Sequence, residues 1–343
     1  MTRVKLGRAR VSPCRSRFAS WHEFVVVVAS VAVFQMGCAT SRDTKLEDWL
    51  PEGVPHSDRP FLEESEAFQF VIVSDRTGGH RSGVFEDAME QVNRLRPSFV
   101  LSVGDLIEGY SEDPEKVERE WDEIEVMIDR LDMPFFYTVG NHDVSNPAML
   151  DAWRARHGRD YWAFVHRGVL FLSLSTEDPP IELSPDIIAR KERFERLMNE
   201  DPEAVERMLA ARAASGPPPE LPTPIAISEE QVAFAAETLA ANPDVRWTVV
   251  LMHKPAWKEN DPGFLGIESL LADRDYTVIA GHEHFYQYYK RRGREYFVLG
   301  TTGGVWISRG PGAMDHVMWV TMTDEGPVFV PLTLDGIRDI TGS

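Results

Sequence analysis

Side chains that could bind metal ions recur at the carboxyl ends of predicted strands. Five short apolar runs are each followed by a carboxylate, an amide or an imidazole, and these groups belong to Asp75, Asp105, Asn141, His253 and the pair His282 and His284. A lone histidine at a strand end is more often structural, but five such ends in one chain are difficult to ascribe to chance. A site with both oxygen and imidazole ligands suits Mn, Fe or Zn, whereas calcium prefers a site made only of oxygen ligands. A carboxylate in the middle of the set could bridge two ions about 3.5 Å apart, an arrangement used for phosphoryl displacement.

The tetrapeptide Gly140-Asn141-His142-Asp143 is the densest of these clusters. It follows the apolar run 134–139, so its amide and imidazole lie where a buried strand ends. Side by side at such an edge, Asn141 suits a metal ligand and His142 a general acid. The alternative is a polar turn, in which Asn141 and Asp143 are present because both residue types favour turns.

The elements that must position these groups begin as alternating strands and helices. Short apolar runs predict strands, and apolar residues at helical spacing predict helices. In chain order the pattern predicts strand 68–73, helix 82–96, strand 98–103, helix 114–131 and strand 134–139. This alternation predicts a parallel sheet with right-handed crossovers.

The rest of the chain contains a segment of different character, 177–227. It is charged, predicted helical over 184–214 and closed by a proline-rich stretch, and it is either a cap over the site or a solvated decoration. The segments outside it are predicted as helix 147–157, hairpin strands 161–165 and 169–175, helix 228–242, strand 245–252, helix 264–272 and strand 276–280. The tail, 285–334, alternates like antiparallel strands, with turns at Gly303-Gly304 and Gly310-Pro311-Gly312.

Length and charge limit the possible functions. The chain has 343 residues, 43% of them hydrophobic, which is enough for one large domain or two small ones with a sizeable core. Its formal net charge of −19 repels polyanions and argues against a nucleic-acid groove. Small phosphate esters remain possible substrates, because a metal ion can supply local positive charge.

Residues 1–37 have the order of a secretory signal. A basic lead precedes an apolar run at 24–34, which is short for a membrane span. The following Gly37-Cys38 resembles a bacterial lipoprotein cleavage site, although Gln35 stands where an aliphatic residue is preferred; an uncleaved anchor or plain secretion are the alternatives. We therefore expect a lipid anchor at Cys38, an acidic, proline-rich tether at 38–66, and a place on the periplasmic side of the cell envelope, at the outer membrane. The only other cysteine, Cys14, lies in the basic lead, so the folded part has no disulfide.

Taken together, the strand-end motifs resemble the signature of the calcineurin-like metallophosphoesterases. The motifs are Asp75, Gly104-Asp105, Gly140-Asn141-His142-Asp143, His253 and Gly281-His282-Glu283-His284, and the resemblance covers about 68–300 apart from the insertion. It implies an α/β fold, a four-layer sandwich of two mixed β-sheets flanked by helices. The domain would span 67–334, with 177–227 as a helical insertion.

The resemblance also implies residue roles around two divalent metal ions. Asp105 would bridge them, Asp75 and His284 would hold the first, and Asn141, His253 and His282 would hold the second. His142 would protonate the leaving alkoxide, Asp143 would orient His142, and a metal-bound hydroxide would attack phosphorus.

One position departs from the family pattern. The family has Asp-x-His at the first strand, and Thr77 occupies the histidine position here. Water, the Thr77 hydroxyl or His80 could complete the weakened first site. Glu108 is a further candidate, because the purple acid phosphatase branch, which also lacks that histidine, places a tyrosine ligand there. Arg76 could contact substrate phosphate or form a salt bridge.

We therefore expect a metallophosphoesterase that hydrolyses small phosphate mono- or diesters. The alternative is a binding protein of the cell envelope that kept the fold and lost turnover. Only Thr77 favours that alternative, whereas His142 and every ligand of the second metal favour the enzyme. The sequence does not indicate which residues bind the rest of the substrate.

Overall fold

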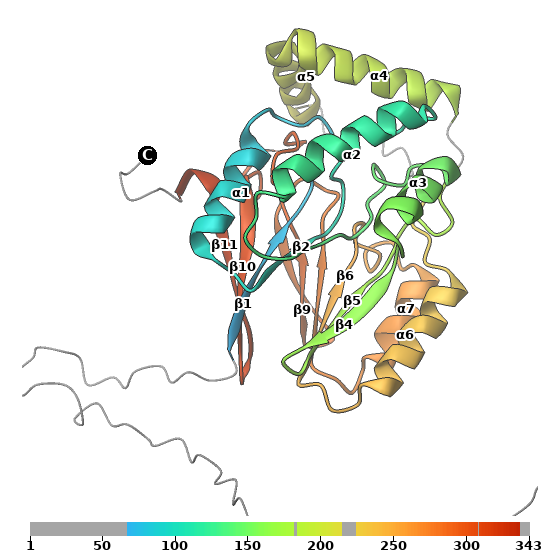
Figure 1. Cartoon of the computed structure of the whole chain (residues 1–343), viewed down its shortest axis with the longest axis vertical. Helices are drawn as coiled ribbons and strands as arrows, with labels where there is room; N and C mark the ends of the chain where they lie inside the picture. Colours follow the sequence, from blue (N-terminus) through green and yellow to red (C-terminus); the bar gives the residue numbers. More distant parts are fainter. Residues whose placement is uncertain (1–66, 182–183, 215–223, 308, 337–343) are drawn as a thin grey trace, which may run out of the picture. The chain divides into compact units, whose positions relative to one another are not determined.

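The computed structural model describes residues 67–181, 184–214, 224–307 and 309–336 (Figure 1). The expected signal at 1–37, with Cys38, and the tether at 38–66 lie outside these residues. No helix within the described ranges is both long and apolar enough to cross a membrane.

Two mixed β-sheets form the centre of the fold (Figure 1). The strands of the first sheet lie in the order β11 (Gly326–Thr333), β10 (His316–Thr323), β1 (Phe68–Val73), β2 (Phe99–Ser102) and β3 (Phe135–Phe136). Those of the second lie in the order β4 (Trp162–His166), β5 (Val169–Ser173), β6 (Trp247–Leu251), β7 (Tyr276–Ala280), β9 (Arg294–Val298) and β8 (Gln287–Arg291). Strands β1–β3 run parallel, as do β5, β6, β7 and β9, while the remaining pairings are antiparallel.

Helices cover the outer face of each sheet. One apolar core joins the first sheet to α1 (Val84–Leu95), α2 (Pro114–Ile128) and α3 (Pro147–His157). A second joins the other sheet to α6 (Glu229–Ala241) and α7 (Pro262–Leu270), and a third lies between the two sheets. This confirms the predicted sandwich of two mixed sheets flanked by helices.

Local signals in the sequence account for the helix starts. Helices α2, α3 and α7 begin with proline after an Asp or Asn whose side chain accepts a backbone N–H of the first turn, namely Asp113, Asn146 and Asp261. Ser228 caps α6 in the same way, by accepting from the Gln231 N–H. Helix α1 ends at Arg96, directly before Pro97.

Two sequence-based predictions fail in detail. Strand β3 contains only two of the six residues expected, because the chain leaves the sheet edge after Phe136 and the Tyr137 carbonyl accepts from the Trp162 indole at 2.7 Å instead. The tail is not purely antiparallel, because β9 pairs in parallel with β7. The segment between β9 and β10 joins the two sheets, and it contains the turn expected at Gly310-Pro311-Gly312, where the Ala313 N–H donates to the Gly310 carbonyl at 3.0 Å.

The insertion consists of α4 (Pro185–Glu200) and α5 (Pro202–Ala214), at the top of Figure 1 beside α2. Lys116 of α2 pairs with Glu195 of α4 at 2.9 Å. Lys191, also in α4, pairs with Glu108 at 2.6 Å. Because these contacts hold α4 against the loop after β2, the structure favours the cap over the solvated decoration.

Candidate metal centre

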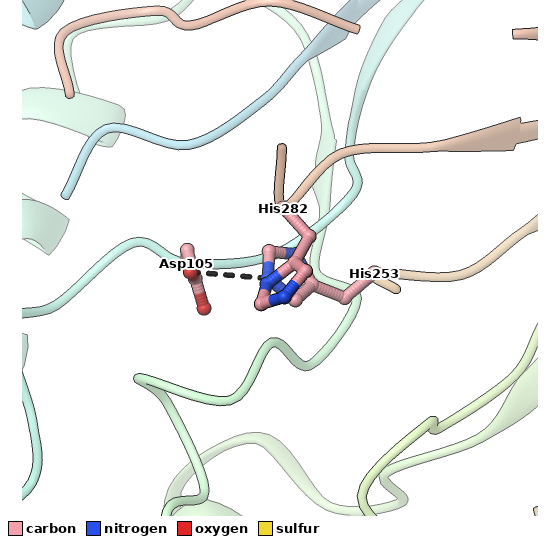
Figure 2. A group of neighbouring side chains, drawn as sticks. All are labelled: Asp105, His253 and His282. Atoms are coloured by element: carbon pink, nitrogen blue, oxygen red, sulfur yellow. Dashed lines mark hydrogen bonds and ion pairs between the residues drawn. The ribbon is translucent and has the colours of Figure 1, made fainter. Parts of the chain in front are cut away.

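Four of the predicted ligands and a shared carboxylate converge at the carboxyl ends of the strands. The ligand atoms form two groups, and within each group all the atoms lie within 4.8 Å of one another. Asp105 belongs to both groups. The first group is Asp75, Asp105 and His284, and the second is Asp105, His253 and His282, the three residues drawn in Figure 2. In the second group, Nε2 of His253 lies 3.0 Å from the Asp105 carboxylate and 3.3 Å from Nδ1 of His282.

The backbone is strained at these ligands. Asp75, Asp105, His282 and His284 adopt φ values of 45°, 59°, 73° and 49°, the left-handed region that residues with a Cβ seldom enter. Each such residue costs about 1–3 kcal/mol, a cost found mainly at functional sites. Gly281 fits this crowding because a Cβ there would collide with the Asp75 carboxylate.

Backbone carbonyls orient two of the imidazoles. Nδ1 of His253 donates to the Val103 carbonyl at 2.8 Å, and Nδ1 of His284 donates to the Val305 carbonyl at 2.5 Å. A carbonyl can only accept, so both rings carry a proton on Nδ1 and present Nε2 to the acidic side chains. This is how proteins usually hold imidazole ligands of metals.

Two buried oxygens without hydrogen-bond partners in the described part of the chain indicate whether the site suits a cation. The amide nitrogen of Asn141 donates to the Tyr110 hydroxyl at 2.9 Å, which turns the amide oxygen the other way. That oxygen and the Thr77 hydroxyl are buried and have no hydrogen-bond partner among the residues that the structure describes. A buried acceptor without a partner is costly, and a cation would satisfy both oxygens. The donor set therefore fits a divalent metal pair.

Protonation states agree with metal binding. Burial would raise the pKa of Asp105, but His253 and His142 hold it well below its usual range. Burial and the charges of His253 and Lys254 hold the pKa of His282 well below its usual range. Burial also disfavours charge on His253, yet Asp105 outweighs it and raises that pKa to about 9. A cation bound to Asp105 would take the place of the His253 proton.

His142 lies beside the ligands without joining them. Its Nδ1 is 2.8 Å from the Glu108 carbonyl and its Nε2 is 3.9 Å from the Asp105 carboxylate, so Nε2 faces the centre. Burial and the nearby Lys191 ammonium lower the pKa of His142 to about 4. A proton on Nε2 therefore requires neighbouring negative charge.

Asp143 does not orient His142 as we expected. Its carboxylate accepts four backbone N–H groups at 2.8–3.2 Å, those of Asp105, Leu106, Ile107 and Gly140. Asp143 thus joins the loop after β2 to the loop after β3, and it positions the backbone of both. The groups next to the His142 ring are the Glu108 carbonyl, Lys191 and Tyr110.

Glu108 is used differently from the substitute ligand we expected. Its carboxylate accepts the backbone N–H groups of Gly79 and His80 at 3.0 and 2.8 Å and pairs with Lys191. It belongs to neither ligand group found among the described residues. His80 lies beside it rather than in a ligand group. Of the two alternatives considered for Arg76, a phosphate contact or a salt bridge, the structure shows a salt bridge, with Glu123 at 2.7 Å.

Sequence reasoning missed Lys191 and Tyr110. Lys191 lies in the insertion, 83 residues after the glutamate it contacts, and nothing in its own neighbourhood distinguishes it from other charged residues of α4. Tyr110 contacts Asn141 through its hydroxyl and His142 through its ring, with ring centroids 4.8 Å apart. Its place close behind Asp105 in the chain was the one available signal.

Comparison with known proteins gives consistent results. A family model described as calcineurin-like phosphoesterase matches residues 68–286. The serine/threonine-protein phosphatase CPPED1 of Bos taurus is 33% identical over 99 residues, which are 27% of this chain and 31% of that protein. The chain thus aligns with about a third of that relative's length.

One solved structure shows the same fold. A dimetal phosphatase from Danio rerio has a TM-score of 0.50 at 15% identity, covering 78% of this chain and 99% of that one. A purple acid phosphatase from Lupinus luteus has a TM-score of 0.49 at 13% identity, covering 80% and 53%.

Proposed function

This chain belongs to the calcineurin-like phosphoesterase family, and on that premise we propose that it is a metal-dependent hydrolase of small phosphate mono- or diesters. The observation that carries the proposal is the pair of ligand groups that share Asp105, with the unpartnered Asn141 oxygen beside them. The alternative, a binding protein without turnover, has no need for two ligand groups with four of their residues at strained backbone positions.

The residues divide into holders and a proton donor. Asp75 and His284 would hold one ion, Asn141, His253 and His282 the other, and Asp105 both. When bound, two divalent ions supply positive charge for the phosphoryl oxygens and lower the pKa of a water molecule. Nε2 of His142 faces this centre, where the negative charge of a phosphate ester favours its protonation. From there it can pass its proton to the leaving oxygen.

Metal content and hydrolysis test this proposal together. The protein is loaded with Mn²⁺, Fe²⁺ or Zn²⁺ and assayed with p-nitrophenyl phosphate and bis(p-nitrophenyl) phosphate. We expect Asn141→Ala to hold less metal per chain and to lose turnover, while Asn93→Ala, on the surface of α1, keeps both. The preferred ester distinguishes a monoesterase from a diesterase. No metal uptake and no turnover with any of the three ions would leave the binding protein as the better explanation.

We further propose that the protein is attached to the cell envelope through a lipid on Cys38. The apolar run at 24–34 and the following Gly37-Cys38 support this. Cys38→Ser should release the protein from the membrane fraction. Retention of that variant in membranes would contradict lipidation at this residue.

A further inference from the structure

A cavity of about 660 Å³ lies between the insertion and the segment after β9. That size is within the range of small-molecule sites, about 300–1,000 Å³. Its wall is mainly apolar, and it is formed by Met198, Val205, Leu209, Val305, Trp306 and Ile307.

The cavity adjoins the metal centre through Val305. The carbonyl of this wall residue accepts the Nδ1 proton of His284, so cavity wall and ligand are in direct contact. The preceding Gly304 donates its N–H to the Asp75 carbonyl at 2.9 Å. Val305 is thus the residue that lies between the cavity and His284 of the first ligand group.

The insertion closes the other side. Lys191 of α4 reaches Nδ1 of His142 at 3.2 Å, while Met198, farther along the same helix, lines the cavity. Helix α5 contributes Val205 and Leu209. Helix α4 thus contacts the proposed proton donor, and α4 and α5 together enclose one side of the cavity.

The charged residues of the lining are two arginines and one glutamate, the exposed Glu203. Arg81 is paired with Asp315 and lies over the Trp306 ring, 4.9 Å from its centroid. Arg309 is exposed, and within the described ranges no acidic side chain pairs with it. A free guanidinium at the edge of an apolar wall suits a ligand with an apolar body and a negative charge.

We propose that this cavity binds the organic group of the phosphate ester, and that this group is an alkyl chain or another apolar body. The proposal rests on the proposed function and deepens it by naming the substrate class. Each methylene buried against the wall should improve kcat/KM by up to about fourfold. Esters of small or strongly polar alcohols would leave the wall uncovered and react poorly.

The test is the rate of phosphate release from methyl, butyl and octyl phosphate by the full, metal-loaded protein. We expect kcat/KM to rise at least about tenfold from methyl to octyl phosphate. Leu209→Trp, which fills the cavity, should abolish most of that rise. Met208→Trp is the matched control, because Met208 is the preceding residue of α5, is 41% exposed and does not line the cavity. Its rates should keep the dependence on chain length.

A second variant avoids dependence on the folding of Leu209→Trp. Ile307 is 43% exposed, so Ile307→Asp adds a charge to the wall at little cost in stability. It should also remove the preference for octyl phosphate. Equal rates for the three esters in the unmodified protein, or an unchanged preference in both cavity variants, would overturn the proposal.

Binding of alkylphosphonates separates this proposal from the proposed function, because their carbon–phosphorus bond is not hydrolysed. Suppose that no ester is hydrolysed, but octylphosphonate binds more tightly than methylphosphonate and Leu209→Trp removes the difference. The cavity assignment then stands and the proposed function fails. If methyl phosphate is hydrolysed but the two phosphonates bind equally, the function stands and the cavity assignment fails.

Discussion

Lys191, in the insertion, lies 2.6 Å from the Glu108 carboxylate and 3.2 Å from Nδ1 of His142. One ammonium group therefore joins α4 to the loop after β2 and also faces the proposed proton donor. Its side chain is only 12% exposed, so solvent screens this ion pair less than it would a surface pair. The insertion thus contacts two residues beside the candidate metal centre.

Removing this ammonium should impair turnover without removing the metal. In Lys191→Met the buried Glu108 carboxylate loses its cation and repels the phosphate of the substrate, so we expect kcat/KM to fall by about tenfold or more. Lys191→Arg should restore part of the loss, and metal per chain should stay unchanged in both. Lys116→Met removes the ion pair between α2 and α4 and serves as the control. A similar loss in both methionine variants would assign Lys191 only to attaching the insertion.

His142→Ala should show its largest effect on esters with poor leaving groups. An alkoxide needs a proton as it leaves, whereas p-nitrophenolate leaves readily without one. We expect a loss of about 10²–10⁴-fold for butyl phosphate and a much smaller loss for p-nitrophenyl phosphate. His80→Ala should not distinguish the two esters, because His80 lies beside Glu108 and outside the ligand groups. Equal losses for both esters in His142→Ala would exclude its role as general acid.

Asp143 should matter chiefly for folding. Asp143→Ala leaves four backbone N–H groups without their acceptor. Each buried donor that loses its partner in this way costs about 1–3 kcal/mol of stability. We expect a drop of at least about 3 kcal/mol in the free energy of unfolding by urea. Asp143→Asn keeps one acceptor oxygen and should lose less. A variant with normal stability and no activity would instead favour the expected role in orienting His142.

Thr77 offers a test of the first metal site. Its buried hydroxyl has no hydrogen-bond partner in the described part of the protein, so Thr77→Val should not destabilise the metal-free protein. The same change removes a candidate oxygen ligand and should lower metal content measured by elemental analysis. Unchanged metal content would show that the hydroxyl does not serve this site.

His157 should make stability depend on pH. It packs against Trp121, Trp153 and Tyr137, and burial lowers its pKa from 6.5 to about 4. Between these values the unfolded chain binds a proton that the folded chain does not, so acid favours unfolding. Burial of neutral His157 therefore contributes fully to the free energy of unfolding above pH 6.5. As the pH falls toward 4 this contribution is lost, and the free energy of unfolding drops by up to about 3 kcal/mol. His157→Phe should flatten this part of the curve of unfolding free energy against pH, and an unchanged slope would contradict this assignment.

Local patterns in the sequence are enough to predict the fold and the two ligand groups. Apolar runs ending in Asp75, Asp105 and His253 are short-range signals, and strands that pair in parallel bring their ends together without further information. Helix α3 and strand β7 were predicted at the bounds observed. The roles of the six expected metal ligands stay predictions, which metal analysis tests.

The errors concern contacts between distant segments. The bonding of Glu108 and Asp143 depends on which loops approach them, and a residue's own neighbours do not encode that. The tail was expected to be antiparallel because alternation reveals a half-buried strand but not its partner. For the same reason the sequence does not show the cavity, whose wall combines residues of α4 and α5 with residues from 305–307 and 309–313.

The pairing of β1 with β10 has a consequence for synthesis. The first strand of the domain completes its sheet with one of the last, and Val305, which orients His284, lies just before that late strand. Such distant pairing slows folding, because the chain entropy must be lost before the contacts form. On a ribosome, β1 would remain an open sheet edge until residue 323 had emerged, and an open edge can pair with other chains and aggregate.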